Sequence, residues 1–421
     1  MNTHAIKKVL LAGMGPAAAQ IAVLLTNSGV EQVDVVSRTK LKSREITAKI
    51  TKSEFPMLQG KASISELNTE MTRLNDDWDT IIYCTPNSAY ADLTRKLNEC
   101  DCPHLKRIIL LSPGIGDNAL VKRLLHKKAD VISLSTYFAA TKWQDYEMLT
   151  TITKNVKKKI YLGSSEGKVS DSILMLKKIF TQAGIHAEVT ENALTSESRS
   201  ITTYVHPPFF MNSFALNEIF FGSGPYKSMY KVYPEGPLTP QVTKDMVLLW
   251  KEITELLRTF GVNPLELIRF LNDDNYPVPE YLLPRELIDG FMTMSQKEQE
   301  YALFVRYTGL LIDPFSSPDQ NGHYLDFSRV PLNRIFKQGE DWIIPRIPLE
   351  DYMKVKRLVM LGEALEMDMP TAQRLTQTFE EYVSQAKLKN ISTIDLEHMY
   401  NQLNQETALI YQHLHQRGIG V

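Results

Sequence analysis

The chain has 421 residues, of which 43% are hydrophobic and 23% charged, as is typical of a folded globular protein with a sizeable core. Lysines and arginines (47) nearly balance aspartates and glutamates (49), and the net charge of -2 gives no electrostatic indication of a nucleic-acid or anionic-membrane partner. The three cysteines are not a disulfide framework. No signal-peptide core and no run of about 18–20 apolar residues is present. We therefore expect a cytoplasmic protein with no nucleic-acid or membrane partner.

Short apolar runs alternate with helical patterns from the N-terminus to about Glu191. Runs of four or five such residues are typical of strands buried on both faces of a parallel sheet. The predicted strands are Val9–Ala12, Val33–Val36, Thr80–Tyr83, Arg107–Leu111, Val131–Leu134, Lys159–Leu162 and His186–Val189. The predicted helices between them include Ala17–Asn27, Ala89–Asn98 and Ser170–Ala183. This alternation predicts an α/β fold, with a Rossmann-type doubly wound parallel sheet over residues 1–191.

The remaining part of the chain, residues 192–421, has helical spacing separated by stretches rich in proline, glycine and asparagine. The predicted helices are Ser213–Phe221, Pro240–Phe260, Pro264–Leu271, Gln296–Ile312, Leu349–Leu365 and Thr371–Gln385. We therefore expect a mostly α-helical C-terminal domain, with the domain boundary near Glu191.

A glycine-rich turn follows the first predicted strand and opens the first helix. Gly13, Gly15 and Ala18 match the pattern G-x-G-x-x-G/A, with Pro16 and Ala17 in the first helical turn. The first glycine allows the tight turn, the second lets a pyrophosphate approach the backbone, and the small third residue lets helix and strand pack closely. A proline suits this turn because the amide it lacks would be unpaired there. The context predicts a dinucleotide site; the alternative is a strand-to-helix turn without a ligand.

The end of the second strand indicates which dinucleotide is bound. An NAD site has an acidic residue there for the ribose 2′-hydroxyl, whereas this chain has Ser37 and Arg38, with Arg44 further on. Asp34 lies within the strand, too early for that position. A hydroxyl and guanidinium groups suit a 2′-phosphate, so we predict NADPH as the cofactor. The alternative is a solvated basic loop.

Further loops at strand ends are candidates for ligand contact, because open α/β sheets bind ligands at the carboxyl ends of their strands. Thr85 and Pro86 follow the Thr80–Tyr83 strand and are predicted to flank the dinucleotide. Lys142, at the end of the segment that follows Val131–Leu134, is a candidate for binding a substrate carboxylate. Plain strand termination is the alternative for each loop.

His206 is the main candidate for chemistry outside the nucleotide-binding region. It precedes Pro207 and Pro208, and a residue before proline is disfavoured in the α region. A rigidly placed imidazole that titrates near neutral pH suits acid/base catalysis. On spacing alone, a hydrogen-bonded structural histidine is favoured over a catalytic one.

Several further segments have distinctive sequences. They are Tyr204–Asn212, Tyr233–Pro237, Val305–Thr308, Leu311–Phe315 (Leu-Ile-Asp-Pro-Phe) and Ile344–Arg346. Together with the glycine turn, these segments resemble the opine metallophore dehydrogenases, the family of staphylopine, pseudopaline and yersinopine type enzymes. Tyr204–Asn212 and Leu311–Phe315 are more specific than the glycine turn, and the likeness extends from the first strand to about residue 360.

The resemblance implies a dimeric enzyme that uses NADPH to reduce the imine formed between an α-keto acid and an aminobutyrate-extended histidine. It implies an acid/base or orienting role for His206, with Asp313 as a candidate to orient it and Tyr204, Lys142 and Arg346 as candidate substrate contacts. It places residues 192–421 in substrate binding and dimerisation. Because metal would bind to the released product, the enzyme itself is expected to need none. The sequence leaves pyruvate and 2-oxoglutarate open, with a slight preference for pyruvate.

Two other functions are compatible with the same residues. One is a two-domain NADPH-dependent reductase of keto or hydroxy acids that needs no amine partner. The other is a non-catalytic NADP-binding sensor or scaffold, which would bind NADPH without oxidising it.

Overall fold

A computed structural model describes residues 6–39, 41–52, 54–75, 77–309, 330–391 and 394–416. The chain divides into two compact units, Met1–Ser200 and Ile201–Val421. The division falls after Ser200 rather than near Glu191, because the short helix α5 (Ala193–Glu197) is hydrogen-bonded into the first unit.

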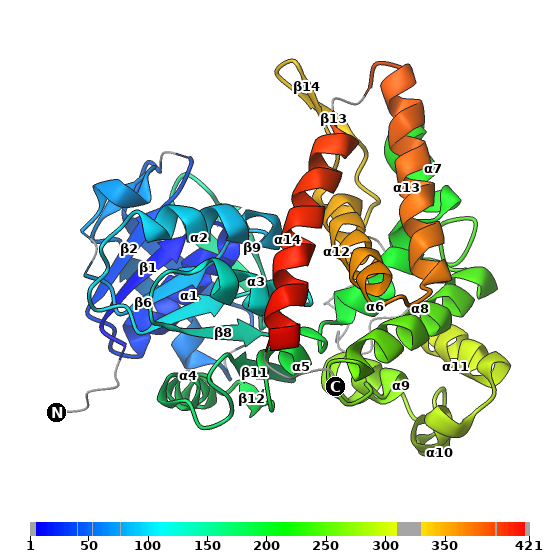
Figure 1. Cartoon of the computed structure of the whole chain (residues 1–421), viewed down its shortest axis with the longest axis horizontal. Helices are drawn as coiled ribbons and strands as arrows, with labels where there is room; N and C mark the ends of the chain where they lie inside the picture. Colours follow the sequence, from blue (N-terminus) through cyan, green and yellow to red (C-terminus); the bar gives the residue numbers. More distant parts are fainter. Residues whose placement is uncertain are drawn as a thin grey trace, which may run out of the picture. The chain divides into compact units, whose positions relative to one another are not determined.

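The first unit is built on an eight-stranded sheet with the order β12-β11-β8-β7-β6-β1-β2-β5 (Figure 1). Its strands are β1 (Lys8–Ala12), β2 (Gln32–Val36), β5 (Leu67–Asn68), β6 (Thr80–Tyr83), β7 (Arg107–Leu110), β8 (Asp130–Leu134), β11 (Lys159–Ser164) and β12 (His186–Val189). The strands from β8 to β5 are parallel, and β11 pairs antiparallel with β8. The order from β5 to β8 is the 3-2-1-4-5-6 arrangement of dinucleotide-binding folds, so the predicted fold class is confirmed.

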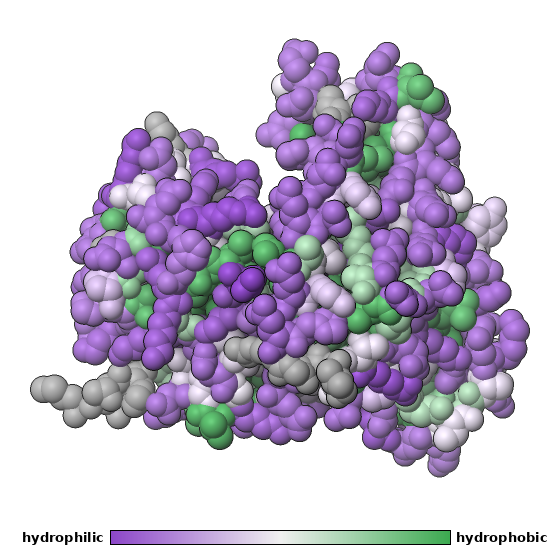
Figure 2. Space-filling model, in the orientation of Figure 1, coloured by the Kyte–Doolittle hydropathy of each residue, from purple (hydrophilic) through white to green (hydrophobic). Residues whose placement is uncertain are grey.

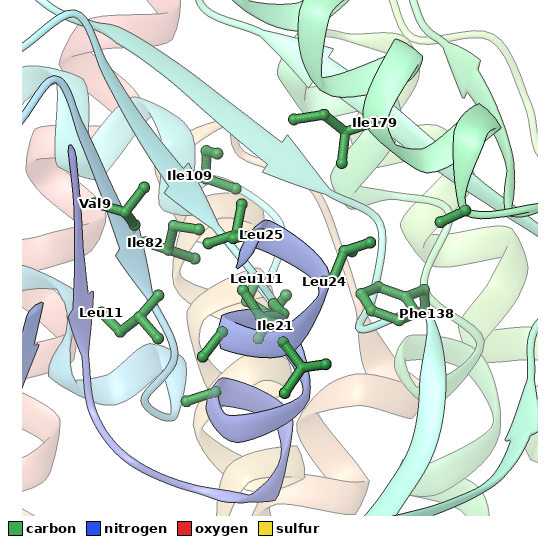
Figure 3. Close-up of a cluster of buried hydrophobic side chains, with 14 of the residues drawn as sticks. Val9, Leu11, Ile21, Leu24, Leu25, Ile82, Ile109, Leu111, Phe138 and Ile179 are labelled. Atoms are coloured by element: carbon green, nitrogen blue, oxygen red, sulfur yellow. The ribbon is translucent and has the colours of Figure 1, made fainter. Parts of the chain in front are cut away.

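Both faces of this sheet are buried, as the continuous apolar runs predict. Side chains alternate between two core clusters, so that Val9 and Leu11 of β1 lie in one and Leu10 and Ala12 in the other. The first cluster lies under helices α1 (Pro16–Asn27) and α4 (Asp171–Gln182), where Ile21, Leu24 and Leu25 of α1 lie near strand residues such as Leu11 and Ile82 (Figure 3). The second cluster lies under α2 (Tyr90–Asn98) and α3 (Asp117–Leu124).

A second, four-stranded sheet packs against α1 and was not predicted. Its order is β4-β3-β10-β9, formed by β3 (Glu45–Ile50), β4 (Gly60–Ser63), β9 (Ala139–Asp145) and β10 (Thr150–Val156). These strands are half-exposed and rich in threonine and charged residues, so they lack the apolar run that identified the first sheet. The prediction that Lys142 ends a loop is wrong, because Lys142 lies inside β9 and pairs with Ile152.

The second unit is mostly helical, as predicted. Its helices are α6 (Ile201–Phe210), α7 (Ser213–Phe221), α8 (Pro240–Arg258), α9 (Leu267–Arg269), α10 (Arg285–Gly290), α11 (Gln296–Gly309), α12 (Arg346–Ala364), α13 (Pro370–Leu388) and α14 (Leu396–Gln416), with a π-helical turn at Phe270–Asn275. A small hairpin joins β13 (Phe336–Gln338) to β14 (Asp341–Ile343). Helix α12 packs against α6, α13 and α14, and α8 packs against α6, α11 and α13.

The backbone of helices α6 and α12 determines where the residues of the candidate site lie. Helix α6 contains Pro207 and Pro208, so His206 is helical, contrary to the expectation that the following proline keeps it out of the α region. The preference of a residue before proline is a steric bias that tertiary packing can override. In α12, Ile347 has non-helical backbone angles (φ -98°, ψ 119°), so the regular helix begins at Pro348, close to the predicted start at Leu349.

Hydrophilic side chains cover most of the face of each unit seen in Figure 2, with hydrophobic groups scattered among them. Among the described residues, no helix is long and apolar enough to span a membrane.

Candidate active site

The glycine turn after β1 is shaped by the neighbouring loop after β6. Gly13 has a φ of +103°, and a Cβ there would lie 2.9 Å from Cγ2 of Thr85. The Gly13 amide donates to the Val36 carbonyl (2.8 Å), and the Cys84 amide donates to the Ala12 carbonyl (2.9 Å). Glycine is therefore required at position 13 by both the backbone conformation and the close approach of Thr85.

Gly15 is a different case, because the protein itself does not require a glycine there. Its φ is -94°, and a Cβ would meet no protein atom within 4 Å. Gly15 is the N-cap residue of α1, so no side chain pairs with the free amides at the helix start. Pro16 opens the helix, and the first turn has no acidic residue. An uncapped helix N-terminus below an open approach suits a pyrophosphate. The residues present therefore fit a dinucleotide.

The end of β2 has the polar and basic character that the sequence predicted. Ser37 is nearly buried, with its hydroxyl accepting from the Thr39 amide (3.3 Å), whereas Arg38 is exposed. Arg44 is also exposed and donates to the Ser65 carbonyl (3.0 Å).

Asp34, the acidic residue of β2, is held inside the fold. Its carboxylate accepts from Trp78 Nε1 (2.9 Å), Gln32 Nε2 (2.8 Å) and the Glu66 amide (2.9 Å). Burial raises the pKa of Asp34, and these hydrogen bonds oppose that rise. Asp34 is fully buried, so it offers no acceptor to a ribose hydroxyl.

Buried carboxylates fix the loops after β6 and β7. Asp117 accepts from Asn87 Nδ2 (3.0 Å) and from the Gly114 amide (2.6 Å), which ties the two loops together. Glu197 accepts from the amides of Gly116 (2.8 Å) and Asn118 (2.7 Å) at the start of α3. Burial, together with the nearby charge of Asp117, raises the pKa of Glu197 to about 8. The carboxyl edge of the sheet is thus held rigidly by its own polar groups.

The positions of Lys142 and Lys157 differ from the sequence prediction. Lys142 is exposed on β9, whereas Lys157, which the sequence placed in a solvated turn, is partly buried beside the loop after β8. Its Nζ donates to Thr136 Oγ1 (2.9 Å), and its amide donates to the Phe138 carbonyl (2.8 Å). Burial lowers the pKa of Lys157 to about 8. Only its position in a lysine run was visible in the sequence.

In the second unit, His206 is paired with an aspartate that the sequence analysis missed. His206 Nδ1 lies 3.3 Å from Asp351 Oδ1, and the exposed fractions of the two side chains are 15% and 3%. Contact of Nδ1 with a carboxylate favours the tautomer or charge state that has a proton on Nδ1 and leaves Nε2 for another partner. Asp351 is thus placed to orient the imidazole.

Aromatic side chains surround the imidazole. The rings of His206 and Phe210 meet edge to face, with centroids 5.0 Å apart, and Tyr230 contacts both Phe209 and Phe210. Tyr204, the predicted substrate contact, is only 1% exposed. It therefore packs within the core of the unit, and its burial argues against direct contact with a substrate.

Glu350 and Arg346 lie on the same first turns of α12 as Asp351. The Arg346 side chain is 71% exposed, with its Nε 3.9 Å from Glu350 Oε2. Burial raises the pKa of Glu350, with the charges of Arg346, Lys354 and His206 lowering it and that of Asp351 raising it. Acidic residues are common in first helical turns, so the sequence offered no sign that Asp351 contacts His206.

Asp313, the residue predicted to orient His206, lies outside the described residues. Among the residues that the structure describes, no cluster of three or more histidine, cysteine, aspartate or glutamate side chains is arranged to hold a metal ion.

Comparisons with known proteins give one consistent result. The sequence profile of the family described as staphylopine dehydrogenase matches residues 7–414. The chain is 39% identical to pseudopaline synthase of Pseudomonas aeruginosa over 394 residues, covering 90% of this chain and 91% of that protein. It is 34% identical to staphylopine synthase of Staphylococcus aureus over 392 residues, covering 89% and 90%.

Among solved structures, yersinopine dehydrogenase with NADP+ bound is similar to this chain with a TM-score of 0.88 and 31% identity, covering 98% of this chain and 99% of that one. Octopine dehydrogenase with NADH and L-arginine has a TM-score of 0.60 at 12% identity, over 90% of both chains. At that identity the second likeness concerns the fold alone.

Proposed function

Because the chain belongs to the staphylopine dehydrogenase family, we propose that it is an NADPH-dependent opine dehydrogenase. It reduces the imine formed between an α-keto acid and an aminobutyrate-extended histidine, the last step in making an opine-type metallophore. The observation that carries this proposal is the pairing of His206 with Asp351 at 3.3 Å. An imidazole oriented by a buried carboxylate is the arrangement that proton transfer to or from a substrate needs.

The first unit binds the cofactor. Gly13, Gly15, Pro16 and Ala17 form the turn and helix start for the pyrophosphate, and Thr85 and Pro86 flank it from the loop after β6. Ser37, Arg38 and Arg44 bind the 2′-phosphate, since a hydroxyl and guanidinium groups complement phosphate oxygens. The open approach over Gly15 and the buried state of Asp34 support this assignment. NADPH supplies the hydride when bound.

The second unit supplies the acid/base group. Asp351 holds His206 by Nδ1, and Nε2 exchanges a proton with the reacting nitrogen or oxygen of the substrates. The aromatic side chains of Phe210 and Tyr230 limit access of water on one side of the imidazole, which strengthens electrostatic interactions there. Asp351 is a positioning residue in this account, because it acts through His206.

Cations are needed for the carboxylates of both substrates. Arg346 is mostly exposed at the start of α12, the helix that carries Asp351, and is our candidate in the second unit. Lys142 and Lys157 are the candidates in the first unit, and Lys157 is the better supported because its partly buried ammonium donates to the Thr136 hydroxyl beside the loop after β8. We propose pyruvate as the keto acid, with 2-oxoglutarate as the alternative, and a cytoplasmic homodimer that needs no metal of its own.

The test follows NADPH absorbance with purified protein, the aminobutyrate-extended histidine, and pyruvate or 2-oxoglutarate. Oxidation that requires both the amine and a keto acid is expected, and the productive pair identifies the keto acid. Oxidation with a keto acid alone would indicate a keto-acid reductase. Tight NADPH binding without oxidation under either pairing would indicate a non-catalytic sensor, and either result would overturn the proposal.

A further inference from the structure

Two carboxylate oxygens at the start of α12, one of them on the aspartate that contacts His206, accept no hydrogen bond from the described part of the protein. Glu350 Oε1 and Asp351 Oδ2 are both buried and without a partner in the described part of the chain. Buried polar atoms are almost always paired in native proteins, and an orphaned one usually marks a ligand, an ordered water or a functional role. Asp351 has its other oxygen on His206, so its position is explained. Glu350 has no comparable explanation.

The surroundings of Glu350 select the kind of group that would pair with it. A carboxylate oxygen only accepts hydrogen bonds, and a charged nitrogen donor is its strongest complement. Arg346 has its Nε 3.9 Å from Oε2, beyond hydrogen-bonding distance, and does not reach Oε1. The carboxylate of a keto acid would be repelled by Glu350 and by the adjacent Asp351. The free oxygen therefore suits a cationic nitrogen.

Burial raises the pKa of Glu350, and the start of helix α12 opposes that rise by favouring the ionised carboxylate. The regular helix begins at Pro348 after the non-helical Ile347, so Glu350 lies in the first turn, where the helix dipole favours a negative charge. The Glu350 side chain is 18% exposed, whereas Oε1 itself is buried. A small molecule can therefore approach the residue, and a hydrogen bond to Oε1 would be shielded from water.

We propose that Glu350 binds a protonated nitrogen of the amine substrate and so holds that substrate next to His206. This inference rests on the proposed function and names the residue that distinguishes the amine from the keto acid. In the reaction Glu350 is a positioning residue, because it recognises the amine without exchanging a proton with the reacting atoms. In this arrangement Glu350 binds the cationic nitrogen of the amine, and the arginine and lysine side chains bind the carboxylates of the substrates.

The test is steady-state kinetics of Glu350→Gln with each substrate varied in turn at saturating levels of the others. Glutamine keeps the shape but loses the charge, and loss of one charge-assisted hydrogen bond corresponds to a rise of about 10- to 100-fold in the KM for the amine. The KM values for keto acid and NADPH should stay within about twofold, and kcat should fall far less than it does without His206. Glu350→Asp keeps the charge and should restore part of the amine affinity. Glu363→Gln, an exposed position on the same helix, is the matched control.

The outcomes separate this inference from the proposed function. If the wild-type enzyme turns over amine and keto acid but Glu350→Gln leaves the KM for the amine unchanged, or raises both KM values equally, the inference is overturned and the proposed function stands. If the wild type shows no turnover, calorimetric titration of the enzyme–NADP+ complex with the amine tests Glu350 by itself. Amine binding that weakens in Glu350→Gln supports the inference, and binding that is absent or unaltered overturns it. If Glu350→Gln does not fold, Glu350→Asp decides: a raised KM for the amine alone supports the inference.

Discussion

The two units of the chain place their candidate residues in different ways. In the first unit, the main cofactor candidates lie in loops that follow strands, with Gly13 after β1, Ser37 after β2 and Thr85 after β6. In the second unit, His206 of α6 meets Asp351 of α12, which lies far away in sequence. A parallel sheet brings the carboxyl ends of its strands to one edge, whereas helix packing follows no such sequence rule. Cofactor sites on sheets are thus more accessible to sequence reasoning than side-chain pairs on packed helices.

The largest expected effect of a substitution is at the His206–Asp351 pair of the second unit. His206→Ala should lower kcat about 10²- to 10⁴-fold, the usual contribution of general acid–base catalysis, while leaving the dissociation constant for NADPH unchanged. Asp351→Asn should have a smaller effect on kcat, because the imidazole is present but less well oriented. His398→Ala, at an exposed histidine of α14, is the control. A comparable loss of NADPH affinity in His206→Ala would contradict the separation of roles between the units.

Substitution of the two glycines in the turn after β1, Gly13 and Gly15, should have different effects on stability and on NADPH binding. Gly15→Ala leaves the fold intact, because its Cβ meets no protein atom within 4 Å, but should weaken NADPH binding by about tenfold or more, equivalent to ~1.4 kcal/mol. Gly13→Ala combines a φ of +103° with a 2.9 Å contact to Thr85, so it should also lower the free energy of unfolding by ~1–3 kcal/mol. Thermal unfolding without cofactor and fluorescence titration with NADPH measure the two effects. Equal unfolding temperatures for the two variants would show that the Gly13 turn is not strained by a side chain.

Cofactor choice should depend on the end of β2. Arg38→Ala should weaken NADPH binding by about 10- to 100-fold, the loss expected for a charge-assisted contact to phosphate, and should leave NADH binding almost unchanged. Arg123→Ala, at an exposed arginine of α3, is the matched control. If NADPH and NADH were weakened equally, Arg38 would not be reading the 2′-phosphate.

The smallest expected effect concerns the buried carboxylate that fixes the sheet edge. Burial raises the pKa of Glu197 from 4.5 to about 8, so the native state holds a proton that the unfolded chain has released. Its contribution to stability is present below pH 4.5 and is lost as the pH rises towards 8. Glu197→Gln should flatten this pH dependence and lower stability by ~1–3 kcal/mol, since the glutamine NH2 group cannot accept the hydrogen bond that a backbone amide donates to the second Glu197 oxygen. Thermal unfolding of both proteins across this range measures it; an unaltered slope in the variant would assign the pH dependence to other groups.

Sequence reasoning identified the elements with a strong local signal. The continuous apolar strands, the glycine turn and the basic end of β2 are local features, and the structure has them where they were predicted, with Thr80–Tyr83 and Ser213–Phe221 matching to the residue. It failed where the signal was weak or non-local. Strand β9, which contains Lys142, has no apolar run. Pro207 and Pro208 led us to expect a non-helical His206, although the residue is helical.

The partner of His206 shows the same limit. Asp351 is one of two acidic residues at the start of a helix, which is a common pattern with no catalytic meaning by itself. Only the packing of α12 against α6 brings it to the imidazole. Lys157 likewise differs from the neighbouring lysines by its burial, which lowers its pKa and which the sequence does not indicate.

The most direct test of the central claim is to follow the hydride itself. The enzyme would be supplied with NADPH carrying deuterium at the transferred position of the nicotinamide, the aminobutyrate-extended histidine and a keto acid, and the products analysed by mass spectrometry and NMR. The account predicts deuterium on the former carbonyl carbon of the keto acid, now bonded to the nitrogen of the amine. Deuterium recovered instead in a free hydroxy acid, with the amine unaltered, would contradict it.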